Sequence, residues 1–152
     1  MSSMLAFMVV LTGCNTNESE YLSVSRIRLA DGSAYMMNYF SDKKITKIEL
    51  RNIRVSDKSI QIIDQSLLDS FSGMLYEINA SGGSVMSIEE YDLIIHYKNK
   101  HGSKGLLRLG VIYSEDSNLM IRGRSVDGTI IGDFYCQNKI SDFLKNLIKD
   151  IR

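Results

Sequence analysis

The sequence predicts an α+β domain in which an antiparallel sheet of hairpins carries two helices. Three observations favour this class. Short runs of β-prone residues recur along the chain, turns rich in Gly, Asn and Asp separate them, and two longer stretches have apolar residues at helical spacing. Strands joined by tight turns pair in antiparallel fashion. We therefore expect the order ββββα-ββββα, with both helices packed on one face of the sheet.

The first three expected strands occupy residues 21–29, 34–40 and 45–55. The first two flank Asp31-Gly32, and an Asp-Gly pair between β-prone runs is a strong hairpin signal. In the third run, apolar residues alternate in part with polar ones. These segments should form consecutive antiparallel strands.

A fourth strand and the first helix are expected next along the chain. Residues 60–63 fit either a short returning strand or the first turn of a helix, and we favour the strand. Asp64 can then accept hydrogen bonds from the free amides at the start of a helix. Apolar residues from Leu67 to Ile78 follow at helical spacing, and Ser81-Gly82-Gly83-Ser84 ends the helix.

The second half of the chain is predicted to be a meander of four strands with a closing helix. Loops rich in Gly, Ser, Asn and Asp separate the strands. The expected strands are residues 91–98, 106–113, 119–124 and 129–136. The helix should run from Lys139 to Ile151, with an apolar stripe along one side and Asn138 or Ser141 as its N-cap.

Length and composition indicate one domain without a bulk charge. The chain has 152 residues, with 18 Lys and Arg against 18 Asp and Glu. Because the net charge is zero, no bulk field would attract nucleic acid. The two cysteines, Cys14 and Cys136, are too few for a disulfide framework. We expect Cys136 to be a small buried side chain, and no cofactor is predicted.

Positive and negative charges are segregated along the chain. Residues 21–58 carry eight Lys and Arg against four Asp and Glu, whereas residues 59–95 carry six acidic residues and no basic one. A basic sheet face would suit an acidic protein or ligand, and the alternative is an ordinary solvated outer face. The predicted binding residues are Arg26, Arg28, Arg51, Arg54, Tyr35 and Tyr39.

Catalytic and metal-binding patterns are weak. The only histidines, His96 and His101, lie on either side of the start of an expected turn, and the sequence contains no zinc-ligand motif. The segment Gly102-Ser103-Lys104-Gly105 matches neither a nucleophile elbow nor a phosphate-binding P-loop. We therefore expect no metal site and no enzyme. The alternative is a small hydrolase that uses His96 or His101 with a carboxylate.

The N-terminus carries the most specific signal in the chain. An apolar run from Met4 to Leu11 ends in Leu11-Thr12-Gly13-Cys14, and the chain becomes polar at Asn15. The run is too short to span a bilayer, which takes about 20 residues, but it matches the apolar region of a signal peptide. With a cysteine at the cleavage point, it resembles the lipobox of bacterial lipoproteins. It departs from the signal-peptide pattern in having no Lys or Arg before the apolar run.

The resemblance implies a division of the chain and a location. Residues 1–13 would be a signal peptide, 14–20 a lipidated Cys14 with a polar tether, and 21–152 one globular domain. The lipid would anchor the protein to a membrane of the cell envelope, facing away from the cytosol. The expected function is non-catalytic binding of a protein or ligand, or inhibition of an envelope enzyme or toxin as an immunity lipoprotein. The alternative is a cytosolic protein whose apolar run is a buried strand or helix.

Overall fold

The computed structural model describes residues 19–20, 36–37, 39–80, 86–113, 119–124 and 129–152. The strands are β1 (Ser19–Glu20), β2 (Lys43–Asn52), β3 (Ser59–Ile62), β4 (Ile78–Ala80), β5 (Tyr91–Asn99), β6 (Lys104–Ile112), β7 (Met120–Arg124) and β8 (Ile130–Cys136). The helices are α2 (Gln65–Gly73), the 3₁₀ helix η2 (Leu75–Glu77) and α3 (Asn138–Asp150).

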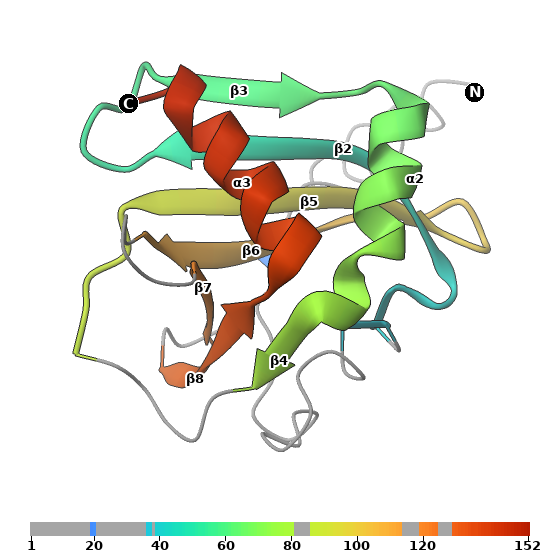
Figure 1. Cartoon of the computed structure of the whole chain (residues 1–152). Coiled ribbons are helices and arrows are strands. Elements are labelled where there is room, and N and C mark those ends of the chain that lie inside the picture. Colours follow the sequence, from blue (N-terminus) through green and yellow to red (C-terminus); the bar gives the residue numbers. More distant parts are fainter. Residues whose placement is uncertain (1–18, 21–35, 38, 81–85, 114–118, 125–128) are drawn as a thin grey trace, which may run out of the picture.

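Seven of these strands form one antiparallel sheet in the order β3-β2-β5-β6-β7-β8-β4 (Figure 1). Near the middle, β5 pairs with β2 along one edge and with β6 along the other. The far edge of β6 pairs with β7 at residues 110–112 and with the parallel strand β1 at Leu106 and Leu107. The predicted α+β class with an antiparallel sheet is confirmed.

The hydrophobic core lies between one face of the sheet and the helices. Figure 1 shows α2 and α3 in front of the sheet. Leu93 and Ile95 of β5 are fully buried, as are Phe71 of α2 and Leu144 of α3, and all four belong to one cluster. Full burial of a Leu, Ile or Phe side chain contributes about 1.5–3 kcal/mol. This cluster therefore leaves the opposite, outer face of the sheet free for polar side chains.

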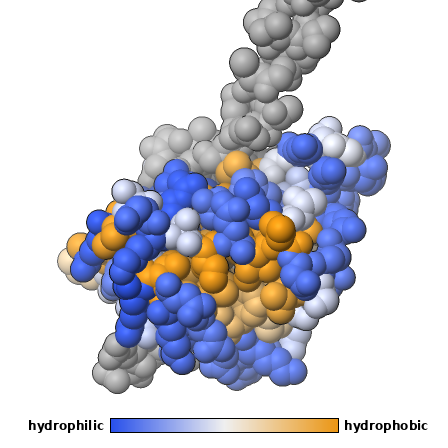
Figure 2. All heavy atoms as spheres, turned by 90° about the horizontal axis from the view of Figure 1, so that it is seen from above, coloured by the Kyte–Doolittle hydropathy of each residue, from blue (hydrophilic) through white to orange (hydrophobic). Residues whose placement is uncertain are grey.

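Apolar side chains also reach the surface at the β3 end of the sheet. Figure 2, a view from above Figure 1, shows hydrophobic residues in the middle of the visible face and hydrophilic residues around them. β3 is the last strand in the sheet order. The segment after it exposes Ile63 to 74% and Leu67 to 45%. The connection from β3 into α2 is therefore partly apolar at its surface.

The start of α2 follows a local signal. Oδ1 of Asp64 accepts a hydrogen bond from the backbone amide of Leu67 at 3.0 Å. The same hydrogen bond contributes most to holding the pKa of Asp64 below its usual value. The predicted cap at Asp64 is confirmed.

The start of α3 depends on a distant residue. Neither predicted cap, Asn138 or Ser141, is correct, because Gln137 occupies the N-cap position and its side chain makes no capping hydrogen bond. Instead, the backbone amide of Ile140 donates to Oε2 of the buried Glu77 at 2.8 Å. A carboxylate from η2 therefore accepts a hydrogen bond from this free amide. Its negative charge also interacts favourably with the positive end of the dipole of α3.

Two predicted elements differ from the structure. Residues 36–37 and 39–40 are helical rather than part of a strand over 34–40, because Met36 and Phe40, four residues apart, both reach the core. The first helix ends at Gly73, and Ile78 instead begins β4, which pairs with β8. The observed order is therefore not ββββα-ββββα within the described residues.

The other predicted strands lie close to observed ones. Those at 45–55 and 60–63 correspond to β2 and β3, and those in the second half correspond to β5, β6, β7 and β8. The strand predicted over 21–29 and the turn at Asp31-Gly32 lie outside the described residues.

Candidate functional site

The outer face of the sheet, turned away from α2 and α3, uses its arginines in ion pairs. The pairs are Arg51–Glu49, Arg108–Asp92, Arg122–Asp133 and Arg124–Glu89. The N···O distance is 2.7 Å in the first and third pairs and 2.6 Å in the last. These guanidinium groups are therefore already neutralised by carboxylates of the same face.

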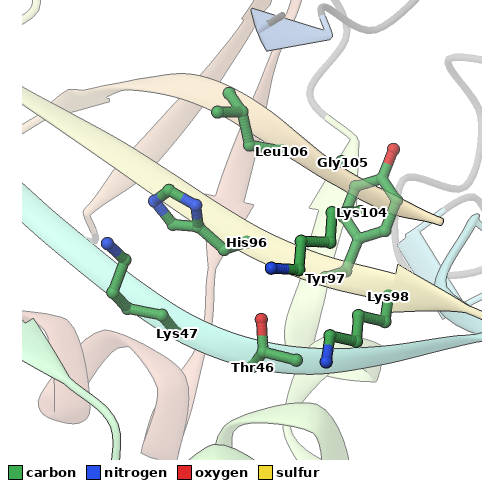
Figure 3. A pocket seen from close by; sticks show the side chains of 8 residues that line it. All are labelled: Thr46, Lys47, His96, Tyr97, Lys98, Lys104, Gly105 and Leu106. Carbon is green, nitrogen blue, oxygen red and sulfur yellow. The ribbon is translucent and has the colours of Figure 1, made fainter. Parts of the chain in front are cut away.

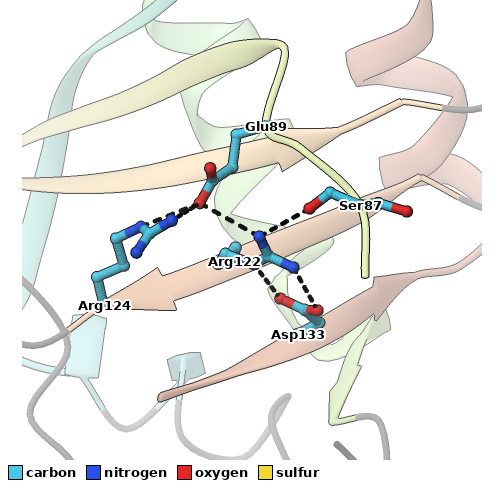
Figure 4. Close-up of polar contacts among 5 residues, drawn as sticks. All are labelled: Ser87, Glu89, Arg122, Arg124 and Asp133. Carbon is cyan, nitrogen blue, oxygen red and sulfur yellow. Dashed lines mark hydrogen bonds and ion pairs between the residues drawn. The ribbon is translucent and has the colours of Figure 1, made fainter. Parts of the chain in front are cut away.

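The most buried of these pairs holds the segment before β5 against the sheet (Figure 4). Arg122 is 4% exposed and donates to both carboxylate oxygens of Asp133, at 2.7 and 3.0 Å. Its Nη1 also donates to the backbone carbonyl of Ser87 at 2.9 Å, and Glu89 lies between Arg122 and Arg124. The hydrogen bond with Asp133 raises the pKa of Arg122 above its usual value. This cluster is structural, because its charges satisfy one another.

A different group of cations surrounds a cavity on the same face, which we call the lysine cavity (Figure 3). Its volume is about 530 Å³. The described lining residues are Thr46, Lys47, His96, Tyr97, Lys98, Lys104, Gly105 and Leu106, from β2, β5 and β6. This lining contains three lysines and no carboxylate. Its volume lies within the range of small-molecule sites, about 300–1,000 Å³.

Lysines also lie directly opposite one another across the strands at this cavity. Lys44 of β2 pairs with Lys98 of β5, and Lys98 pairs with Lys104 of β6. Neither these three side chains nor Lys47 forms an ion pair or hydrogen bond with another described residue. Like charges directly opposite each other destabilise a sheet. Among the described residues, the arrangement therefore concentrates positive charge at one place.

A β-bulge in β2 contributes to the cavity. The register between β2 and β5 shifts between Ile45 and Lys47, so that Thr46 is the extra residue. Ile45 and Ile48 are buried in the core, while Thr46 and Lys47 between them both line the cavity. A regular strand would send two successive side chains to opposite faces. The bulge therefore brings a hydroxyl and an ammonium group to the outer face together.

His96 lies at the cavity beside a carboxylate. Its Nε2 is 3.6 Å from Oε2 of Glu49, which is too long for a hydrogen bond, and this buried nitrogen has no partner among the described residues. Burial, together with the charge of Lys47, lowers the pKa of His96 below its usual 6.5. Burial would raise the pKa of Glu49, but the hydrogen bond from Arg51 and nearby positive charge lower it overall. The ring is therefore neutral near pH 7, and Glu49 is ionised.

The predicted binding residues do not meet at this cavity. Arg51 is paired with Glu49, and Arg54 is exposed in the turn after β2. Tyr39 packs instead at the other end of β2, where its hydroxyl is 2.9 Å from that of Tyr97 and its ring is 4.3 Å from Nζ of Lys43. Lys43 and Arg51 are eight residues apart on one strand, or about 26 Å.

The remaining predicted site residues fall elsewhere. Cys14, Arg26, Arg28 and Tyr35 lie outside the described residues. His101 is exposed in the turn between β5 and β6.

Sequence reasoning missed the lysines that line the cavity. Lys98 and Lys104 stand symmetrically on either side of the turn at 99–103, so a hairpin register could have placed them opposite each other. Lys47 and Thr46 gave no comparable signal, because their shared orientation depends on the bulge.

Other kinds of site receive no support within the described residues. No group of three or more His, Cys, Asp or Glu residues there could hold a metal ion. No helix there has the length and hydropathy needed to cross a membrane. Cys136 is fully buried, and burial strongly raises the pKa of its thiol, which keeps it protonated. Its predicted role as a small buried side chain is confirmed.

Comparisons with known proteins give no relative from which a function could be transferred. No protein-family model, no curated protein and no solved structure matches the chain significantly. Inference about function therefore rests on the residues and geometry of this chain.

Proposed function

We propose that the protein is a membrane-anchored lipoprotein of the cell envelope, facing away from the cytosol, whose small non-catalytic domain binds a ligand or protein through the outer face of its sheet. The observation that carries the proposal is the sequence Leu11-Thr12-Gly13-Cys14 behind an apolar run. Transfer of a diacylglyceryl group to the Cys14 thiol, followed after cleavage by acylation of its amine, would supply the anchor. Two such chains give stable membrane binding where one is marginal.

Chain length connects this anchor with the outer face. Ser19 pairs with Leu106, and Leu106 lines the lysine cavity. The five-residue step from Cys14 to Ser19 spans at most about 18 Å. A lipid on Cys14 would therefore hold this side of β6 within that distance of the membrane surface.

The charges of the outer face favour an acidic binding partner. The arginines of its strands are ion-paired, whereas Lys47, Lys98 and Lys104 at the cavity form no ion pair with another described residue. An acidic protein or an anionic small molecule would neutralise these three ammonium groups. Inhibition of an acidic envelope enzyme or toxin is the form of this proposal in which the partner is a protein.

A small hydrolase is the second candidate, favoured by one contact. His96 lines the cavity with its pKa lowered by burial, and Glu49 lies 3.6 Å from its Nε2. A neutral imidazole beside a carboxylate could act as a general base. Hydrolysis of chromogenic carboxylic or phosphate esters that is lost in His96→Gln would support this candidate. Equal rates for parent and variant would reject it.

Labelling of bacterial cells with a fatty-acid probe tests the anchor. We expect label on the parent chain and a mass that corresponds to loss of residues 1–13 and gain of acyl groups. Cys14→Ala should lose both label and membrane association. Cys136→Ala is the matched control, because it removes the other thiol of the chain and should leave both unchanged. A Cys14→Ala protein that keeps label and membrane fractionation would refute the anchoring proposal.

A further inference from the structure

We propose that the lysine cavity is a binding site for a phosphate ester, held by the ammonium groups of Lys47, Lys98 and Lys104 and by the hydroxyl of Thr46. This inference rests on the proposed binding role of the outer face, but not on lipidation of Cys14. The four groups come from β2, β5 and β6 and line one cavity of about 530 Å³ (Figure 3).

The donor set favours phosphate over carboxylate. A carboxylate is planar and is best recognised by the paired donors of an arginine fork. The described cavity lining contains no arginine, but it contains three separate point charges and one hydroxyl. A phosphate group offers several oxygens in a tetrahedral arrangement, which suits donors that approach from three strands.

The size and lining of the cavity favour an ester rather than a bare ion. A volume of about 530 Å³ is far larger than one phosphate group, whose organic substituent would occupy the rest. Leu106 supplies an apolar side chain, and Gly105 also lines the cavity. The ring of Tyr97 fills the space on the core side of Gly105, where an added Cβ would lie 2.6 Å from it. The cavity floor is therefore fixed by close packing from below.

Anion binding would also relieve a charge arrangement that the fold leaves unbalanced. Lys44, Lys98 and Lys104 form a row of directly opposed lysines, without an ion pair to another described residue. The charged groups that face His96 are Lys47, Glu49 and Arg51 from β2, with Lys98 and Lys104 in the same cavity lining. An anion beside Lys47 would offset the positive charge that disfavours protonation of His96. Ligand binding should therefore raise the pKa of His96.

Two sources of the ester can be separated with the full chain, kept in an uncharged maltoside detergent for the soluble probes and freed of detergent for the vesicles. The probes are inorganic phosphate, glycerol 3-phosphate, and vesicles of phosphatidylglycerol compared with vesicles of phosphatidylcholine. Binding is followed through amide chemical shifts of Thr46, Lys98 and Lys104 and through co-sedimentation with the vesicles. Acetate at equal concentration tests for a general anion effect.

Variants identify the site. Lys98→Ala with Lys104→Ala should weaken binding by at least about tenfold, because each charge-assisted hydrogen bond contributes about 1.5–3 kcal/mol. Lys139→Ala with Lys149→Ala on α3 removes the same charge from outside the cavity and should change affinity less than about twofold. Both double variants should keep the amide dispersion of the folded parent.

Each outcome decides the inference. Binding of glycerol 3-phosphate that needs Lys98 and Lys104 supports a free ester as ligand, and binding of phosphatidylglycerol vesicles alone supports a lipid headgroup. No binding in either arm, equal affinity for acetate, or equal losses in both double variants would overturn the inference. Cys14→Ala keeps the cavity, so phosphate binding by this variant separates failure of the anchor from failure of the site.

Discussion

Replacement of Lys98, the middle lysine of the row with Lys44 and Lys104, should stabilise the fold. Directly opposed side chains have Cβ atoms about 5 Å apart. For ammonium groups about 7 Å apart in a water-like dielectric, each repulsion amounts to about 0.6 kcal/mol. Lys98→Gln removes two such repulsions, so the free energy of unfolding should rise by about 1 kcal/mol. For a domain of this length, that raises Tm by about 3 °C.

Urea unfolding at low ionic strength, followed by circular dichroism, measures this gain. In about 1 M salt the Debye length is only about 3 Å, so the gain should disappear. Lys139→Gln on α3 is the matched control and should change the unfolding free energy by less than about 0.5 kcal/mol. A Lys98→Gln protein that is less stable than its parent, or whose gain survives high salt, would refute the reasoning. The same substitution should weaken phosphate binding. A variant that is more stable but binds phosphate less well has lost charge repulsion and a ligand contact without damage to its fold.

Three further predictions concern the outer face and the floor of the cavity. Arg122→Ala should lower the unfolding free energy by about 3–5 kcal/mol, because it leaves the buried carboxylate of Asp133 unpaired. The double variant Arg122→Leu/Asp133→Leu removes both charges, and in urea unfolding it should recover much of the loss. Stability should decrease as pH falls through 6.5, since His96 is protonated there in the unfolded chain but stays neutral in the folded one. Thermal unfolding from pH 7.5 to 5.5 should show a smaller decrease of Tm with falling pH in His96→Gln than in the parent. An equal decrease would contradict the lowered pKa of His96. Gly105→Ala should cost about 1–3 kcal/mol, because its Cβ would clash with the ring of Tyr97; equal urea midpoints for variant and parent would show that the ring can move aside.

Local signals in the sequence predicted much of the fold. The side chain of Asp64 before an apolar helical pattern located the start of α2, and alternating residues located β5 and β6. The strand predicted over residues 34–40 was wrong, because Met36 and Phe40 fit one face of a helix as well as they fit a strand. Ile78 misled for a similar reason, since it is buried in β4 as it would be in a longer helix. Short apolar runs do not distinguish these alternatives without tertiary contacts.

The candidate site was harder to predict than the fold. Strand charges are visible in the sequence, but their pairing is not, because Arg122 meets Asp133 and Arg51 meets Glu49 only once orientation and register are set. The row of opposed lysines depends on the β2–β5 register, which long-range packing determines. Binding of an acidic partner by the predicted arginines and tyrosines therefore stays a prediction. The lysine cavity, in contrast, could be identified only from the three-dimensional arrangement.

The hydrogen bond from Ile140 to Glu77 has a consequence for how the molecule assembles. The donor and the acceptor are 63 positions apart, and the Gln137 side chain makes no local bond that would start the last helix. A segment of this length is marginally helical alone in water. The segment of α3 should therefore stay unstructured until η2 has formed and placed Glu77, so that α3 should be among the later elements to become ordered.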